Sequence, residues 1–345
     1  MVRKLKQFAN VLFGIVLLPT SSKSFLDNPV LGNQLLNKMG LYIIRAVIAH
    51  GVFHLKLLCL SPFLDASMRK QYKSQGFIQY SDFLPEDQFN ALEQEVRAYS
   101  GDAWQNTQGD TVTQRVFLNY QNVKSLPACR QLMLSADYLK PLKYTSAKNE
   151  SPRFYIQQIQ NERVSSRKKD PQKTFHMDTF HPTMKAWLFL EDVTLENGPF
   201  TYVPGSNRLT WKRIKWLYNQ SVVGKNLDNK YSRKGSLRIT EDELETLGYA
   251  EPKQFVVPKN TLVIGNTFGF HCRGAVTRAN ASRLEIWAIS RVNPFNPFPG
   301  INCKWLSDAR DWVYTSFEER EHATAQARQQ TATWNKVSNA RFKNN

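Results

Sequence analysis

Two residues near the middle of the chain, His176 and Asp178, have the types and the spacing of a metal site. If residues 175–178 are extended, positions i and i+2 point to the same face, and the imidazole and the carboxylate converge on one point. A second histidine from a distant strand would complete the facial arrangement that holds ferrous iron and leaves positions open for O₂ and a co-substrate. A surface histidine beside a turn aspartate would give the same short motif.

Residues further along the chain supply the rest of such a site. His271 comes soon after residues 260–264, which have the pattern of a buried strand. Arg283 lies twelve residues after His271, at the start of the alternating segment 284–290. A strand-borne guanidinium near a metal can bind a carboxylate through two parallel hydrogen bonds, as the distal end of 2-oxoglutarate requires. His181 is an alternative ligand, and its other interpretation is a loop histidine before Pro182.

With their neighbours, these residues resemble the phytanoyl-CoA dioxygenase (PhyH-like) family of Fe(II)/2-oxoglutarate-dependent oxygenases. The resemblance extends from about residue 76 to residue 297, and it rests on three groups of residues: His176-Met177-Asp178, Glu196-Asn197-Gly198-Pro199-Phe200 with Val203-Pro204-Gly205-Ser206, and His271 followed by Asn280-Ala281-Ser282-Arg283. It implies an enzyme that uses Fe(II), 2-oxoglutarate and O₂. It also implies that the iron ligands are His176, Asp178 and His271, and that Arg283 binds the far carboxylate of 2-oxoglutarate.

The resemblance implies further co-substrate contacts. Trp187 looks like the tryptophan that the family has on the strand after its His-x-Asp loop, and Ser282 stands beside Arg283 in the third motif. Tyr155 and Gln157, on the alternating segment 154–159, have suitable polarity and position, but either could be an ordinary sheet residue.

The sequence departs from the family pattern in two places. Asn207 stands where family members usually have histidine, and Phe270-His271-Cys272 replaces the usual Trp-His-Gly run. The second difference puts the shape of the pocket in doubt, but not the histidine ligand. The reaction that the resemblance implies is hydroxylation of a substrate with release of succinate and CO₂.

The charge of the chain points to an anionic partner. Lysine and arginine number 46 against 29 acidic residues, for a net charge of +17. Two basic segments could flank the site: Arg163, Arg167, Lys168, Lys169 and Lys173 before His176, and residues 208–238, in which Trp211, Trp216 and Tyr218 are interleaved. We therefore predict an anionic small-molecule substrate, either a lipid or a lipid-linked molecule, although a solvated basic face would look similar.

Two other functions fit parts of this pattern. Aromatic residues among basic ones suit single-stranded nucleic acid, so a nucleic-acid demethylase with the same chemistry is one alternative. A non-catalytic jelly-roll protein that binds lipid or glycan is the other, and it would predict an incomplete iron site. The apolar N-terminus favours lipid over nucleic acid.

The first 75 residues differ in composition from the rest of the chain. They contain ten basic and two acidic residues, with apolar runs at residues 8–19 and 41–60. The first run is too short to span a bilayer, and the second carries four ionisable residues: Arg45, His50, His54 and Lys56. We predict amphipathic helices that lie on an anionic membrane with their basic residues near the headgroups. A secretory signal, or a helical subdomain packed on the main domain, are the alternatives.

The remaining pattern predicts a mainly β fold with flanking helices, a double-stranded β-helix of the jelly-roll, cupin-like kind. Strands are expected at residues 154–159, 186–193, 200–203, 255–257, 261–264 and 284–290. The oxygenase domain would span residues 76–300 with a basic, partly helical insertion at 208–248, followed by a helix and a frayed tail at 301–345. Four widely separated cysteines indicate a reducing environment, so we expect a cytoplasmic protein associated peripherally with a membrane. The oligomeric state stays open.

Overall fold

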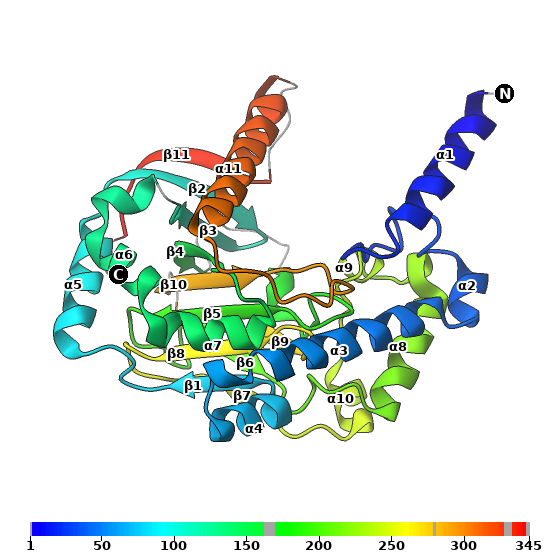
Figure 1. The fold of residues 1–345 in the computed structure, drawn as a ribbon, viewed down its shortest axis with the longest axis horizontal. Helices are drawn as coiled ribbons and strands as arrows, with labels where there is room; N and C mark the ends of the chain where they lie inside the picture. The colour runs from blue at the N-terminus through cyan, green and yellow to red at the C-terminus, as the bar shows by residue number, and fades with distance from the viewer. Residues whose placement is uncertain (1, 120, 162–169, 279–280, 328–332, 343–345) are drawn as a thin grey trace.

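Two antiparallel sheets form the centre of the molecule (Figure 1). The computed structural model describes residues 2–119, 121–161, 170–278, 281–327 and 333–342. The large sheet has the strand order β1-β8-β5-β10-β4-β3-β2-β11, and the small sheet has the order β7-β6-β9. The strands are β1 (Phe77–Tyr80), β2 (Gly101–Gln108), β3 (Thr111–Phe117), β4 (Arg153–Gln160), β5 (Met184–Phe189), β6 (Phe200–Tyr202), β7 (Lys253–Gln254), β8 (Leu262–Asn266), β9 (His271–Arg273), β10 (Ser282–Ser290) and β11 (Asn335–Ala340). This confirms the predicted double-stranded β-helix.

Helices surround the two sheets in the described part of the chain (Figure 1). The N-terminal segment forms four of them, and helices α8 to α10 lie in the insertion after β6. The helices are α1 (Val2–Val16), α2 (Gln34–Lys38), α3 (Leu41–Cys59), α4 (Ala66–Gln75), α5 (Glu86–Ala98), α6 (Pro127–Leu134), α7 (Ala136–Ser146), α8 (Trp211–Val223), α9 (Lys230–Arg233), α10 (Glu241–Leu247) and α11 (Lys304–Ala327).

Strand β10 organises the large sheet because its two faces have different partners. Leu284, Ile286 and Ala288 are fully buried in the core beneath the helices, which explains the alternating pattern of this segment. Residues of the opposite parity, including Arg283 and Trp287, line a cavity on the other face. The register places β10 between β4 and β5, so side chains from three strands meet on the cavity side.

Helices α5, α6 and α7 cover the core face of the large sheet (Figure 1). Phe89, Leu92 and Val96 form the buried face of α5. In the insertion, which was predicted to be partly helical, a capping box of Thr240 and Glu243 begins α10, and Gly248 ends it in the left-handed conformation.

The N-terminal segment is helical, as predicted, but α3 packs against the main domain. Its buried residues Tyr42, Ala46 and Ala49 share one apolar cluster with Phe180 and Phe268. The alternative of a helical subdomain packed on the domain is therefore observed for α3. In contrast, α1 and α11 both project from the body of the molecule (Figure 1).

The C-terminal tail differs from its prediction as a frayed segment. Residues 335–340 form β11, which pairs with β2 at the edge of the large sheet. Ala340 and Phe342 are buried in the core, and the Phe342 ring stacks on Tyr99. The prediction was wrong because β2, the strand that the tail pairs with, has a polar sequence and was not recognised.

The predicted and observed bounds of two strands differ slightly. The predicted strand at 255–257 is reduced to a bridge between Val257 and Val193, and the strand of this region is β7, two residues earlier. Strand β5 ends at Phe189, short of the predicted residue 193. The predicted basic residues Arg163, Arg167, Lys168 and Lys169, and Asn280 of the third motif, lie outside the described residues.

The position of β10 predicts a large cost for truncating its core face. Replacing the fully buried Leu284 by alanine leaves a cavity between sheet and helices, and we expect the free energy of unfolding to fall by about 3 kcal/mol. Equilibrium urea denaturation measures this change. Leu134→Ala, at a position that is 65% exposed on α6, is the control and should change stability by less than about 0.5 kcal/mol. Equal effects of the two substitutions would contradict the described core.

Candidate active site

A backbone bridge holds His176 and His271 side by side. The amide of each donates to the carbonyl of the other, at 3.0 Å in both directions. His271 begins β9, whereas His176 lies in a loop that makes isolated bridges to His271 and Arg238. The extended conformation that the sequence predicted for residues 175–178 is thus present only locally. The two imidazole rings lie 4.5 Å apart, centroid to centroid.

Both rings are oriented by their own backbone. The Nδ1 atom of His176 donates to the carbonyl of Thr174 at 2.8 Å, and Nδ1 of His271 donates to the carbonyl of Gly269 at 2.9 Å. Each neutral imidazole then carries its lone pair on Nε2. Both Nε2 atoms are buried without a hydrogen-bond partner. A buried lone pair that no donor satisfies is costly, unless a cation binds there.

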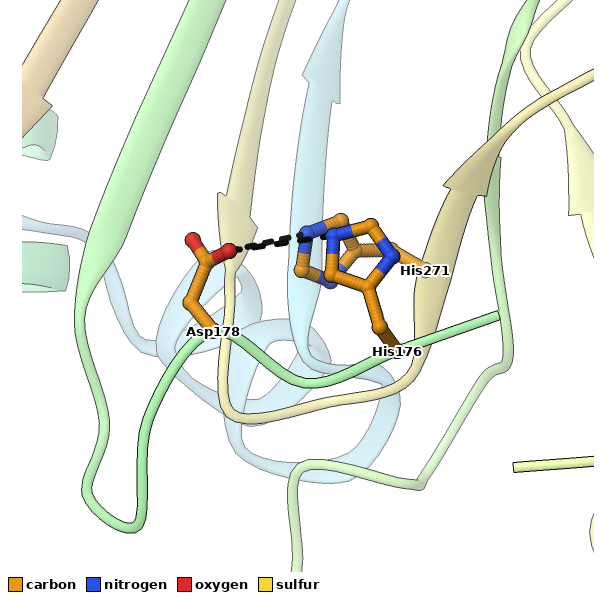
Figure 2. A group of neighbouring side chains, drawn as sticks. All are labelled: His176, Asp178 and His271. Atoms are coloured by element: carbon orange, nitrogen blue, oxygen red, sulfur yellow. Dashed lines mark ion pairs between the residues drawn. The ribbon is translucent and has the colours of Figure 1, made fainter. Parts of the chain in front are cut away.

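Asp178 faces both of these nitrogens (Figure 2). Its Oδ1 atom lies 3.8 Å from Nε2 of His176 and 3.8 Å from Nε2 of His271. One ligand atom from each of the three residues lies within 4.8 Å of the others, so the group could hold a metal ion. Two nitrogens and one carboxylate on one side of an ion form the ligand set that suits Fe(II) and leaves its other side open.

The protonation states also suit a metal. Burial lowers the pKa of His176 well below its usual value and that of His271 to about 4, so both imidazoles are neutral at physiological pH. Burial acts to raise the pKa of Asp178, but nearby positive charge, above all Lys185, outweighs it and holds that pKa well below the usual value. All three groups are therefore in the forms that coordinate metals.

Four cations from different parts of the chain surround Asp178. The Nζ atom of Lys185 on β5 lies 2.7 Å from Oδ2 of Asp178, and Nζ of Lys23 donates to the Asp178 backbone carbonyl. Arg238 and Arg291 also act electrostatically on this cluster. Burial is the main reason that the pKa of Lys23 falls to about 8. A single carboxylate thus faces several positive charges before any metal adds more.

A cavity of about 270 Å³ opens beside the two histidines. It lies between the cavity face of the large sheet and the small sheet, and it receives side chains from the C-terminal tail as well. The charged side chains that line it are all basic: Arg115, Lys185, Arg273, Arg283 and Arg291. A pocket of this composition suits a small anion.

Arg283 lies in this cavity but already has partners. Its Nε atom is 2.8 Å from Oε2 of Glu285, and its Nη1 atom donates to the carbonyl of Gly198 at 2.7 Å. Both side chains are almost completely buried. Glu285 also accepts a hydrogen bond from Gln157, so the guanidinium is fixed in place by a network from β10 and β4. Sequence reasoning did not identify Glu285, although it has the same parity as Arg283 on β10.

The other predicted co-substrate residues separate into two groups. Trp187 lines the cavity and packs against Phe200, with ring centroids 4.2 Å apart, and Gln157 lines it while accepting a hydrogen bond from Arg115 at 2.6 Å. Tyr155 and Ser282 are not among the residues that line the cavity. Tyr155 stacks on Phe117 at 5.0 Å in the aromatic core between the sheets, and Ser282 is buried on the opposite face of β10 from Arg283.

His181 is not part of the three-residue group. It is buried, its Nδ1 donates to the Pro182 carbonyl at 3.1 Å, and its ring packs against Phe180. Burial lowers its pKa to about 3, as expected for a neutral histidine in a packed loop. The loop-histidine interpretation of the sequence is the one that the structure supports.

Several cavity residues were missed from the sequence. Lys185 could have been found, because it precedes Trp187 by two and must share its face of β5. Arg115 and Trp334 could not, because β3 was not predicted and Trp334 belongs to the tail. The Arg115 guanidinium lies 3.9 Å from the ring centre of Trp287 and 4.7 Å from that of Trp334.

The fold and the site together define a metal-dependent oxygenase of the cupin-like class. Residues 72–237 match the family model described as phytanoyl-CoA dioxygenase (PhyH). Over these residues, just under half of the chain, the sequence is similar to the phytanoyl-CoA dioxygenase family, and the protein is an Fe(II)/2-oxoglutarate-dependent dioxygenase. Its cofactor is accordingly Fe(II), with 2-oxoglutarate and O₂ as co-substrates. No curated protein sequence matches the chain.

Solved structures with a similar fold are distant. The epimerase SnoN, in complex with Fe3+, alpha ketoglutarate and nogalamycin RO, is 16% identical with a TM-score of 0.42, over 65% of this chain and 81% of that one. HygX from Streptomyces hygroscopicus, with nickel, 2-oxoglutarate and hygromycin B bound, is 13% identical with a TM-score of 0.38, over 65% and 86%. AviO1 from Streptomyces viridochromogenes Tue57 is 15% identical with a TM-score of 0.39, over 66% and 95%.

The geometry predicts which histidine substitutions abolish metal binding. We expect His271→Ala to weaken Fe(II) binding at least about 100-fold, because it removes one of two nitrogens that face Asp178. Anaerobic calorimetric titration of Fe(II) measures the affinity. His181→Ala removes a buried histidine of the same loop that faces elsewhere, and it should leave the affinity within about threefold of the wild type. Loss of Fe(II) binding in His181→Ala alone would contradict the assignment.

Proposed function

We propose that the enzyme hydroxylates an anionic lipid or lipid-linked substrate and releases succinate and CO₂. In this proposal His176, Asp178 and His271 hold the iron, and Arg283 binds the distal carboxylate of 2-oxoglutarate. The observation that carries the anionic substrate is the group of four cations, Lys23, Lys185, Arg238 and Arg291, around the single carboxylate of Asp178.

The charge balance supports an anion beyond 2-oxoglutarate. Arg273 is already paired with Asp170 at 2.6 Å, and Arg283 with Glu285, so these two cavity cations have carboxylate partners. Arg291 is exposed at the end of β10, on the same side of the sheet as Lys185. A negatively charged substrate at this side would offset the repulsion among these cations and the metal.

The origin of two of these cations links the site to the basic segments of the sequence. Lys23 belongs to the N-terminal segment and reaches the backbone of Asp178. Arg238 belongs to the insertion after β6 and pairs its backbone with His176. The segments predicted to bind an anionic surface therefore also contribute directly to the surroundings of the proposed iron.

Membrane association is part of the proposal, because α1 has no apolar surface to pack on along much of its length. Phe8, Leu12, Phe13 and Val16 are exposed on this projecting helix (Figure 1). The helix is apolar from residue 7 to residue 16 but too short to span a bilayer. An amphipathic helix with such residues lies in the headgroup region. We place the enzyme on the cytoplasmic side, since its four cysteines are free.

Within this proposal each part of the site has a defined task. Bound Fe(II) would supply the oxidising chemistry, by coupling decarboxylation of 2-oxoglutarate to hydroxylation of a C–H bond. The carbonyls of Thr174 and Gly269 keep the two Nε2 atoms turned to the metal side. Lys185 holds Oδ2 of Asp178, which leaves Oδ1 facing the histidines. Trp187 and Phe200 form an apolar wall that limits water in the cavity.

The first prediction from the proposed function concerns the binding of 2-oxoglutarate. Removing Arg283 alone would leave the buried carboxylate of Glu285 without its cationic partner. The informative change is therefore Arg283→Gln with Glu285→Gln. We expect the double variant to bind 2-oxoglutarate at least about 30-fold more weakly, because a buried charge-assisted contact is lost. The visible charge-transfer band of the anaerobic Fe(II)/2-oxoglutarate complex reports this binding.

Glu285→Gln alone is the control for this experiment. It keeps the guanidinium and should keep most of the affinity for 2-oxoglutarate. A folded double variant with unchanged affinity would show that the distal carboxylate binds elsewhere, for example at Arg115 or Arg273, which line the same cavity.

The second prediction concerns the charge of the substrate. Succinate release should be stimulated by long-chain alkyl phosphates and not by the matching neutral alcohols. Arg291→Gln should raise KM for the charged compound about five-fold, as expected for one partly exposed charge contact, and added salt should reduce the difference. Arg278→Gln, the same change at an exposed position away from the cavity, is the matched control.

Three results would contradict an anionic lipid substrate. Equal stimulation by the alcohols would remove the charge requirement. Equal effects of Arg291→Gln and Arg278→Gln would remove the role of the cation cluster. Stimulation by methylated single-stranded oligonucleotides alone would favour the demethylase alternative.

A further inference from the structure

Helix α3 turns three of its four ionisable residues toward the protein, whereas His54 is exposed. Arg45, His50 and Lys56 are only 4%, 5% and 2% exposed. The Arg45 guanidinium donates to the carbonyls of Leu18, Thr20 and Ser22 and lies over the Phe180 ring at 4.3 Å. His50 meets the edge of Phe268 with ring centroids 4.4 Å apart. The orientation is the reverse of that predicted from the sequence, in which the basic side chains would have faced lipid headgroups.

The outward side of the same helix is a continuous apolar stripe, which we call the α3 face: Ile44, Val47, Ile48, Leu55 and Leu58. These residues are between 47% and 65% exposed, although each is a large aliphatic side chain. Their spacing of three, four and seven residues places them on one side of the helix. Gly51 lies in the middle of the stripe, and a Cβ there would meet no atom within 4 Å. The 19 residues of α3 give the stripe a length of about 28 Å.

The stripe continues beyond α3 in the preceding helix. Leu35 in the first turn of α2 and Met39 directly after its last residue are 66% and 71% exposed. Exposed aliphatic residues are common singly, but a stripe that extends over two successive helices indicates an interaction surface.

Charge identifies the partner as a lipid surface. No acidic residue occurs between Asp27 and Asp65, so the segment that carries the stripe has no negative side chain of its own. Lys38 is exposed at one end, and Lys73 lies close enough to His54 on α3 to lower its pKa, in addition to the effect of burial. A second copy of the chain would bring the same positive charge to the contact, whereas anionic headgroups would neutralise it.

We propose that the α3 face lies in the plane of an anionic bilayer surface and docks the enzyme on it. This inference rests on the membrane association proposed above and names the surface that makes it. The helix is long and apolar enough to cross a membrane by composition, but its inner half is packed in the protein core. Crossing would expose Arg45, His50 and Lys56 to hydrocarbon, so α3 lies along the membrane instead.

Docking through α3 would bring the active site close to the lipid. On the inner side of α3, Tyr42 contacts Phe180, two residues after Asp178, and His50 contacts Phe268, three residues before His271. Only the thickness of one helix, about 10 Å, then separates the bilayer surface from the loops that carry the metal-binding group. A substrate anchored in the bilayer would need to rise only a short distance to reach the cations around Asp178.

The test is binding of the full-length protein to lipid vesicles. Ile48→Asp with Leu55→Asp places two negative charges in the stripe without touching the core. We expect its partition onto vesicles of phosphatidylglycerol and phosphatidylcholine to fall at least about 30-fold in a sedimentation assay. The matched control is Leu134→Asp with Leu195→Asp, two leucines that are 65% and 60% exposed elsewhere, and it should bind like the wild type. Thermal melts confirm that both variants fold.

Each other outcome overturns a defined part of the inference. Normal binding of the α3 variant, with loss of binding in Phe13→Asp on α1, would assign the contact to α1 alone. Equal binding to pure phosphatidylcholine would remove the requirement for anionic lipid. A wild-type dimer in analytical ultracentrifugation that dissociates in the α3 variant would make the stripe a contact between two copies.

Failure of this inference is separable from failure of the proposed reaction. A wild-type protein that binds no vesicles overturns both the α3 face and membrane association. Succinate release stimulated by a dispersed alkyl phosphate would still be measured in that protein, because the iron site does not include the stripe.

Discussion

The reciprocal hydrogen bonds between the backbones of His176 and His271 are the contact on which the site depends. They join a loop to the first residue of β9, and so bring together residues 95 positions apart in the sequence. Because both Nδ1 atoms are occupied by neighbouring carbonyls, both lone pairs point to one place. The rest of the fold buries both histidines and supplies the carboxylate and the cations around them.

The three residues of the candidate metal site were predictable from the sequence because two of them are only two positions apart and the third follows a recognisable strand. A separation of two residues places His176 and Asp178 on one side of any extended segment, whether or not it belongs to a sheet. His271 and Arg283 were proposed from their positions beside predicted strands and then from the family resemblance. The match to the phytanoyl-CoA dioxygenase model covers residues 72–237 and so includes His176 and Asp178, but it ends before His271 and Arg283. The segment 284–290 was predicted as a strand, and it lies within β10.

Contacts between distant and polar segments were not predictable in this way. Strands β2 and β3 carry few aliphatic residues, so no periodicity revealed them, and with them the partner of the C-terminal tail stayed hidden. Arg115 and Trp334 consequently enter the cavity without a signal in the sequence. Ser282 was predicted to contact the co-substrate but does not line the cavity. It directly precedes Arg283 in β10, and successive residues of a strand point to opposite faces.

The N-terminal segment shows why the composition of a helix does not determine its orientation. The helical spacing of its residues separates a more polar side from an apolar side, but either side can face the protein when the protein offers suitable partners. Here the segment between α1 and α2 offers three carbonyls to Arg45, and Phe180 and Phe268 offer aromatic surfaces to Arg45 and His50. Those partners stabilise Arg45 and His50 in the interior. The aliphatic side chains on the opposite side of the helix then face outward. A helix that buries its charged residues together with apolar ones can thus present aliphatic side chains to the outside.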